Sequence, residues 1–148
     1  MTPLHPVDLH LLLTRGDQVL MALRANTGYA DGQWNLPSGK LEPGEDALTG
    51  MIREAREEIG LRLHPSELRL ASTVHQRNPS GSTRIGLVFA APHDPAGHGT
   101  PANAEPHKCA AINWFPLTGL PPDTVPYTAA CIEAFRAGVP FALNGFPR

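Results

Sequence analysis

The chain has 148 residues, of which 12 are Lys or Arg and 14 are Asp or Glu, so its formal net charge is −2. That length suits one domain with its own hydrophobic core. The near balance of charge excludes a basic surface that would hold a nucleic-acid polymer, and no apolar run approaches the roughly 20 residues that span a bilayer. We therefore expect a single soluble domain over residues 1–148, with neither a nucleic-acid polymer nor a membrane as its partner.

The amino-terminal segment lacks the basic leader and uninterrupted apolar stretch of a secretory signal, because Asp8 precedes the short apolar run at residues 9–13. The sequence therefore predicts a cytoplasmic protein. Cys109 and Cys131 have no metal-like spacing, and we expect both to be reduced.

The first elements are predicted to be a pair of strands. Residues 7–13 and 18–24 are β-prone runs joined by a short connector that contains Gly and Asp, which predicts an antiparallel pair. Residues 25–33 have no periodicity and predict a loop. A short buried segment follows at residues 34–36, which Pro37-Ser38-Gly39 should end.

Residues 46–59 predict an amphipathic helix, because apolar side chains recur there at offsets of three and four. Gly60 is the expected end of this helix. The predicted buried stripe consists of Leu48, Met51, Ile52, Ala55 and Ile59.

The second half of the chain predicts three strands and a closing helix. In chain order these are strands at residues 67–74, 84–90 and 110–115 and a helix at residues 127–137. A turn-rich loop at 76–83 should join the first two strands. Residues 92–106, rich in Pro, Gly and His, predict a long loop with some mobility.

Glu54, Glu57 and Glu58 are the strongest candidates for chemistry. Their spacing places the three carboxylates within an arc of about 100° on the predicted helix. Like charges this close destabilise a helix and raise each other's pKa, and a hard divalent cation such as Mg²⁺ or Mn²⁺ would relieve the repulsion. The alternative interpretation is an ordinary solvated acidic face.

The residues around these glutamates follow the pattern G-x5-E-x7-R-E-U-x-E-E-x-G-U over residues 39–61, where U is an aliphatic residue and Ala55 is a small occupant of that position. This pattern resembles the Nudix box. Residues 34–42 resemble a segment of the MutT-like branch of the same family, and so do residues 103–109 followed by residues 114–116. The resemblance implies an α/β Nudix fold, an α/β/α sandwich with a mixed β-sheet.

The resemblance also implies roles for the box residues. Glu54, Glu57 and Glu58 would bind one or more Mg²⁺ ions, for which Mn²⁺ can substitute, and the Gly39 carbonyl would add a backbone ligand. Arg53 and Glu45 would position these groups, although an ordinary ion pair explains them equally well.

The general base stays open, because members of the family carry it either on the box helix or in a later loop. Glu54, Glu57 and Glu105 are the candidates, and a solvated loop residue is the alternative interpretation of Glu105.

Several basic residues flank the predicted site in sequence and are candidate contacts for the substrate phosphates or leaving group: Arg24, Lys40, Arg77, Arg84 and Lys108. Each of them could instead be a solubilising surface charge. Trp34 and Trp114 could stack on a base but suit a core equally well. No histidine is assigned to a metal.

The resemblance predicts a Mg²⁺-dependent pyrophosphohydrolase that cleaves a phosphorus anhydride in a nucleoside triphosphate and releases a nucleoside monophosphate and pyrophosphate. One alternative is hydrolysis of a nucleoside diphosphate linked to a sugar or other group. It is less favoured, because Gln76 stands where ADP-ribose-cleaving members often have proline, and Pro79 comes three positions later. Another alternative, a non-catalytic nucleotide-sensing module, fits poorly with a complete set of box glutamates. We expect a small nucleotide-like partner and a monomer or homodimer.

Overall fold

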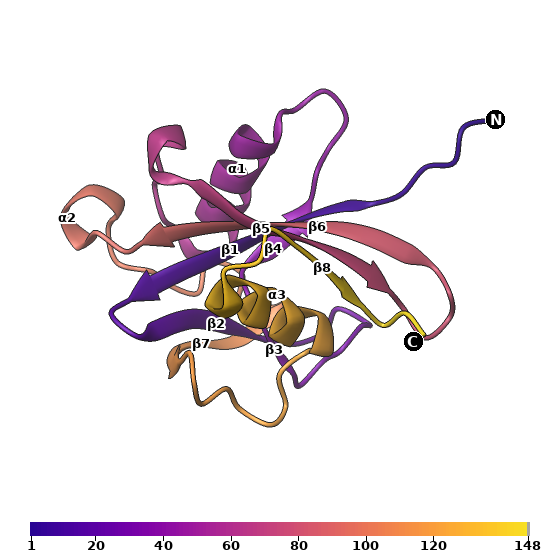
Figure 1. Cartoon of the computed structure of the whole chain (residues 1–148). Coiled ribbons are helices and arrows are strands. Elements are labelled where there is room, and N and C mark those ends of the chain that lie inside the picture. The colour runs from indigo at the N-terminus through magenta and orange to yellow at the C-terminus, as the bar shows by residue number, and fades with distance from the viewer. Residues whose placement is uncertain (148) are drawn as a thin grey trace.

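A mixed sheet of eight strands lies between two helices in the computed structural model, which describes residues 1–147 (Figure 1). The strands are β1 (Val7–Arg15), β2 (Gln18–Arg24), β3 (Trp34–Asn35), β4 (Ser38–Lys40), β5 (Arg69–Arg77), β6 (Thr83–Pro92), β7 (Cys109–Pro116) and β8 (Phe141–Asn144). The helices are α1 (Ala47–Ile59), α2 (Pro95–His98) and α3 (Pro126–Ala137), with a 3₁₀ turn η1 (Pro65–Glu67). The expected α/β class with a mixed sheet is confirmed.

The sheet has the order β3-β2-β1-β6-β5-β8, with β4 paired to β1 and β7 paired to β2. β1 runs parallel to β6 and antiparallel to β2, as predicted for the first two strands. Along one edge β1 changes partner: its end pairs with β2 at Thr14 and Arg15, whereas its start pairs with β4 from Asp8 to His10. β1 and β2 therefore separate at the start of β1, where β4 takes the place of β2.

β1 is buried on both faces, which explains its nearly continuous apolar run. Leu9, Leu11 and Leu13 pack in the cluster formed with α1, and Leu12 packs in the cluster formed with α3. None of these four side chains is exposed to solvent. The strand therefore joins the two layers of the core, with α1 on one face of the sheet and α3 on the other (Figure 1).

Helix α1 begins and ends as the sequence predicts. The Asp46 side chain accepts a hydrogen bond from the Thr49 N–H at 2.9 Å, and Gly60 ends the helix in the left-handed conformation with φ of 69°. The predicted stripe is wrong at Leu48, which is exposed. The reason is that α1 approaches β1 at Gly50, which lies about 200° from Leu48 around the helix.

The structure differs from the sequence expectations at three strands. Ser38–Lys40 does not simply end a segment but pairs with β1 as β4. The strand predicted to start at residue 67 starts at Arg69, because Pro65–Glu67 form a 3₁₀ turn capped by His64. β8 was not predicted, since its four residues are too few to show a periodicity.

The segment from residue 92 to 108 is more ordered than a long loop. It contains α2, and it bonds to the end of α1 through the Ala102 N–H to the Ile59 carbonyl at 2.9 Å and the Ala104 N–H to the Glu58 carbonyl at 3.1 Å. Cys109 and Cys131 are both free, as expected. Among residues 1–147 no helix combines the length and the apolarity needed to cross a membrane.

The contact at Gly50 predicts a measurable packing constraint. A Cβ there would lie 2.7 Å from Leu9 Cδ1 and 2.8 Å from Glu45 Oε1. We expect Gly50→Ala to lower the free energy of unfolding by about 1–3 kcal/mol, because overpacking outweighs the gain of about 1 kcal/mol in helix propensity. Denaturant unfolding measures the change. Gly119→Ala is the control, since a Cβ there meets only Pro116 at 3.6 Å; equal stability of both variants would contradict the constraint.

Candidate active site

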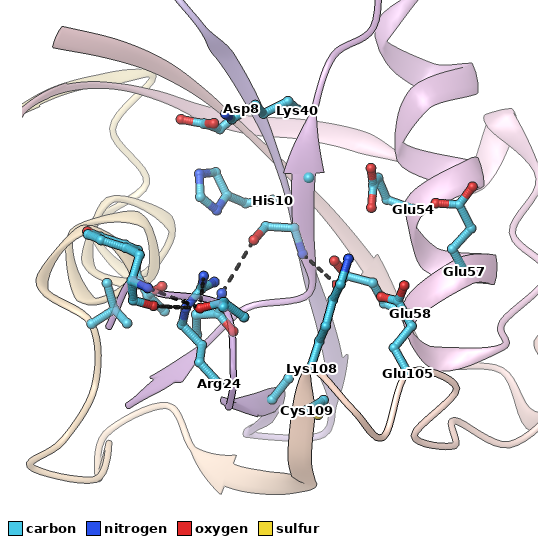
Figure 2. Close-up of a pocket in the computed structure, with 18 of the residues that line it drawn as sticks. Asp8, His10, Arg24, Lys40, Glu54, Glu57, Glu58, Glu105, Lys108 and Cys109 are labelled. Atoms are coloured by element: carbon cyan, nitrogen blue, oxygen red, sulfur yellow. Dashed lines mark hydrogen bonds between the residues drawn. The ribbon is translucent and has the colours of Figure 1, made fainter. Parts of the chain in front are cut away.

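A cavity of about 790 Å³ opens where β1 and β2 separate. Side chains from α1, β1, β2 and β4 line it, together with residues 105, 108 and 109 and the start of α3. Figure 2 shows ten of the lining residues by name. The sheet and both layers of helices therefore contribute to one hollow.

One wall of the cavity is acidic. Glu54, Glu57, Glu58 and Glu105 line it, and we call this group the acidic wall. Glu58 accepts a hydrogen bond from the Ser38 N–H at 3.0 Å. Gly39 lies directly against the Glu54 carboxylate, with which a Cβ at this position would overlap. The structure thus brings together the predicted box carboxylates, the predicted backbone ligand and the loop candidate Glu105.

Burial controls the charge of this wall. Burial first, and then the neighbouring Glu54 carboxylate, raise the pKa of Glu58 to about 8. Burial is also the main cause of the raised pKa of Glu54, against which the Arg53 hydrogen bond acts. The Glu105 carboxylate also raises the pKa of both Glu54 and Glu58. A positive charge placed beside these carboxylates would favour their ionisation.

Arg53 connects the helix to the preceding loop. Its Nε and Nη2 donate to the two Glu45 carboxylate oxygens at 3.0 and 2.7 Å, and its Nη1 donates to Glu54 at 2.8 Å and to Glu57 at 3.3 Å. These partners raise the pKa of Arg53 above its ordinary value, with the Glu45 hydrogen bond as the largest cause. Such an arrangement suits a positioning role for Arg53. Its guanidinium holds the Glu45 carboxylate of the loop and the Glu54 and Glu57 carboxylates of the acidic wall together.

The side chains of the acidic wall do not form a coordination group as they stand. Within residues 1–147, no three His, Cys, Asp or Glu side chains are gathered closely enough to hold a metal ion. Glu54 and Glu57 turn towards Arg53, and Glu58 turns towards the Ser38 N–H. The donors nevertheless fit a hard divalent cation: they are carboxylate and carbonyl oxygens, and the single Arg53 guanidinium only partly offsets the charge that the glutamates carry when ionised.

The basic candidates divide into two groups. Arg24, Lys40, Arg84 and Lys108 line the cavity, whereas Arg77, at the end of β5, lies outside it. Arg84 is already engaged, because its Nε and Nη2 donate to the two Asp8 oxygens at 2.8 and 2.9 Å. The expectation that Arg77 contacts the substrate is therefore not supported by its position.

Neither tryptophan lines the cavity. Trp34 packs edge-to-face on Phe115 with ring centroids 4.7 Å apart, and Trp114 packs beside His93 with the Arg15 guanidinium over its ring. Both contact the hydrophobic core, which agrees with the core interpretation.

Sequence reasoning missed a buried polar group on the other side of the cavity. Asp8 and His10 on β1 and Tyr127 on α3 line the cavity and are each less than 9% exposed. The Tyr127 hydroxyl donates to Asp8 Oδ2 at 3.0 Å. Burial lowers the pKa of His10 to about 4, so the ring is neutral at pH 7. The sequence signal for this buried polar group was the presence of two polar residues, Asp8 and His10, inside the apolar run at 7–13.

Comparisons with known proteins agree with this geometry. A family model described as NUDIX domain matches residues 3–135. The CTP pyrophosphohydrolase of Escherichia coli (strain K12) is 34% identical over 127 residues, which cover 85% of this chain and 87% of that protein. The human protein "8-oxo-dGDP phosphatase NUDT18" is 34% identical over 115 residues, covering 78% of this chain but 33% of its own length. This chain thus spans about a third of that relative.

A solved structure gives the same fold. The MutT NUDIX hydrolase from Burkholderia pseudomallei superposes with a TM-score of 0.78 at 25% identity, covering 89% of this chain and 98% of that one. The sheet and its flanking helices therefore follow the arrangement of that enzyme.

The raised pKa of Glu58 predicts how stability depends on pH in metal-free protein. Folded Glu58 binds a proton up to about pH 8, whereas the unfolded side chain loses it near 4.5. The free energy of unfolding should therefore fall by about 2 kcal/mol between pH 6.5 and pH 8. This range avoids the opposing titration of His10, which occurs at lower pH. Denaturant unfolding in the presence of chelator at pH 6.5 and at pH 8 measures the change.

Glu58→Gln should remove most of this pH dependence, whereas Glu133→Gln, on the exposed face of α3, should keep it. The same slope in both variants would mean that Glu58 is not the group responsible.

Proposed function

This chain belongs to the NUDIX domain family, and we propose that it is a Mg²⁺-dependent pyrophosphohydrolase that splits a nucleoside triphosphate into a nucleoside monophosphate and pyrophosphate. The observation that carries the proposal is the complete box at residues 39–61, whose glutamates line a cavity of nucleotide-compatible size. We also propose that residues 1–148 act as one Nudix domain, because a single sheet carries every strand of the described chain.

The carboxylates of Glu54, Glu57 and Glu58 and the Gly39 carbonyl would hold the divalent cation. A bound cation of this kind neutralises phosphate charge and lowers the pKa of a coordinated water. Arg53 keeps its two wall carboxylates in place through the bonds described above. Arg53 is therefore a positioning residue in this proposal.

Basic side chains at the cavity would bind the phosphates. Lys40 and Lys108 supply mobile ammonium groups, and Arg24 supplies a planar guanidinium that donates to the Tyr29 carbonyl at 2.7 Å and to Thr27 Oγ1 at 3.0 Å. Arg24 is thus held before a ligand arrives, which limits the entropy lost on binding.

A nucleoside diphosphate derivative is the second candidate substrate. Two relatives are named for different substrates: one is a CTP pyrophosphohydrolase, named for a nucleoside triphosphate, and the other is an 8-oxo-dGDP phosphatase, named for a nucleoside diphosphate. The triphosphate is favoured because the first of these relatives is matched over most of its length. Catalysis is favoured over nucleotide sensing because every box glutamate is present.

Purified protein should therefore hydrolyse at least one nucleoside triphosphate with Mg²⁺ or Mn²⁺ and release pyrophosphate rather than phosphate. Excess chelator should abolish turnover, and Glu57→Gln should lower kcat by at least about 10²-fold, because it removes a charge that would bind the cation without disturbing the core. Chromatography of the nucleotide products with separate assays for phosphate and pyrophosphate measures this. Full turnover in chelator, or wild-type kcat in the variant, would refute the proposal.

Glu105 provides a test of the general base. If it removes the proton from the attacking water, Glu105→Gln should lower kcat by about 10²- to 10⁴-fold with KM and metal affinity little changed. If it binds the cation instead, more Mg²⁺ should partly restore the rate. Steady-state kinetics across a Mg²⁺ titration separates the two outcomes, and unchanged kinetics would return the base to Glu54 or Glu57.

A further inference from the structure

His10 is an unpaired polar side chain at the wall of the cavity. It is 5% exposed, and neither of its ring nitrogens has a hydrogen-bond partner. In the described part of the chain, the only other buried side-chain polar atom without a partner is Ser72 Oγ, which does not line the cavity. An unpaired buried donor or acceptor reduces the stability of the fold. Because His10 lines the cavity, its unpaired nitrogens point to a hydrogen-bond partner that a bound ligand would supply.

The neighbours of His10 cannot supply that partner. The Tyr127 ring meets the imidazole edge-to-face with centroids 4.7 Å apart, but its hydroxyl donates to Asp8. Both Asp8 oxygens in turn accept from Arg84. Gly86 faces the two rings and has no side chain that could bond to His10. A Cβ at this position would lie 3.1 Å from His10 Nε2 and would overlap the Tyr127 hydroxyl.

We propose that His10 is a specificity-determining residue that hydrogen-bonds an uncharged polar group on the nucleoside half of the substrate. This inference rests on the proposed function, in which the phosphates lie at the acidic wall.

The position of His10 favours the nucleoside half. Figure 2 shows Glu54, Glu57 and Glu58 well apart from Asp8 and His10 on the other side of the view, so phosphates bound at the glutamates would leave the far end of the substrate near His10. A nucleotide also fits the cavity volume of about 790 Å³.

The chemistry of the imidazole favours an uncharged group. A neutral ring offers one donor and one acceptor, which matches the edge of a base or a sugar hydroxyl. Asp8 and Arg84 close by form an ion pair, so they supply no net positive charge for an anion at this point. Both nitrogens are buried although the residue lines the cavity, and a rotation about the Cβ–Cγ bond, a broad torsion, would turn one of them towards a ligand.

His10→Phe tests the proposal, because it keeps a planar ring against Tyr127 and removes both nitrogens. The variant should melt a few degrees higher than wild type, since it no longer buries unpaired nitrogens. Its selectivity, measured as ratios of kcat/KM among nucleoside triphosphates, should fall at least about tenfold. Comparison of the four ribonucleoside triphosphates tests whether His10 contacts the base. Comparison of each ribonucleotide with its deoxyribonucleotide tests whether His10 contacts the sugar. Loss of selectivity in either series supports the proposal.

Ser72→Ala is the matched control. It also removes an unpaired buried polar atom, so its melting temperature should rise while the selectivity stays that of wild type. His10→Leu replaces His10→Phe if the larger ring prevents folding.

Unchanged selectivity in the folded His10 variant would overturn this inference and leave the proposed hydrolase intact. Absence of any nucleotide turnover by wild type would overturn both.

Discussion

The Arg53 guanidinium is the interaction on which the site depends. It binds Glu45 in the loop before α1 and two glutamates on α1 itself, so one cation fixes the loop, the helix and part of the acidic wall. Arg53 is only 18% exposed, which protects these bonds from screening. The same bonds explain why the glutamates of the wall do not converge on one point: their charge is partly neutralised by the protein's own cation.

The cavity combines two environments of opposite character. In the acidic wall, burial raises the pKa of Glu54 and Glu58, so the ionisation of these two carboxylates is coupled to the arrival of positive charge. On the other side, Asp8 is paired with Arg84 and Tyr127, and His10 is kept neutral. In the proposed function, the first side binds the metal and the phosphates and the second recognises neutral polar groups. The two sides come from different elements, since β1 carries Asp8 and His10 whereas α1 carries Glu54, Glu57 and Glu58.

The sequence predicted best where a local pattern determines the structure. The extent of α1 follows from its apolar periodicity and a terminal glycine, and the first hairpin follows from two β-prone runs around a short turn. Prediction failed where distant segments meet. Leu48 is exposed because Gly50 sets the approach of α1 to β1. Asp8 and His10 form a polar group only together with Arg84 of β6 and with Tyr127 of α3, more than a hundred residues later.

The segment that carries Glu105 is joined to the acidic wall through the main chain. Ala102 and Ala104 bond to the last carbonyls of α1, and the Arg62 N–H bonds to the carbonyl of His98, whose buried ring bonds to Glu67. These contacts run from the 3₁₀ turn to the cavity. A substitution at Glu67 would remove the partner of the buried His98 ring, so it would weaken the anchoring of the segment that carries Glu105 without contacting the cavity itself.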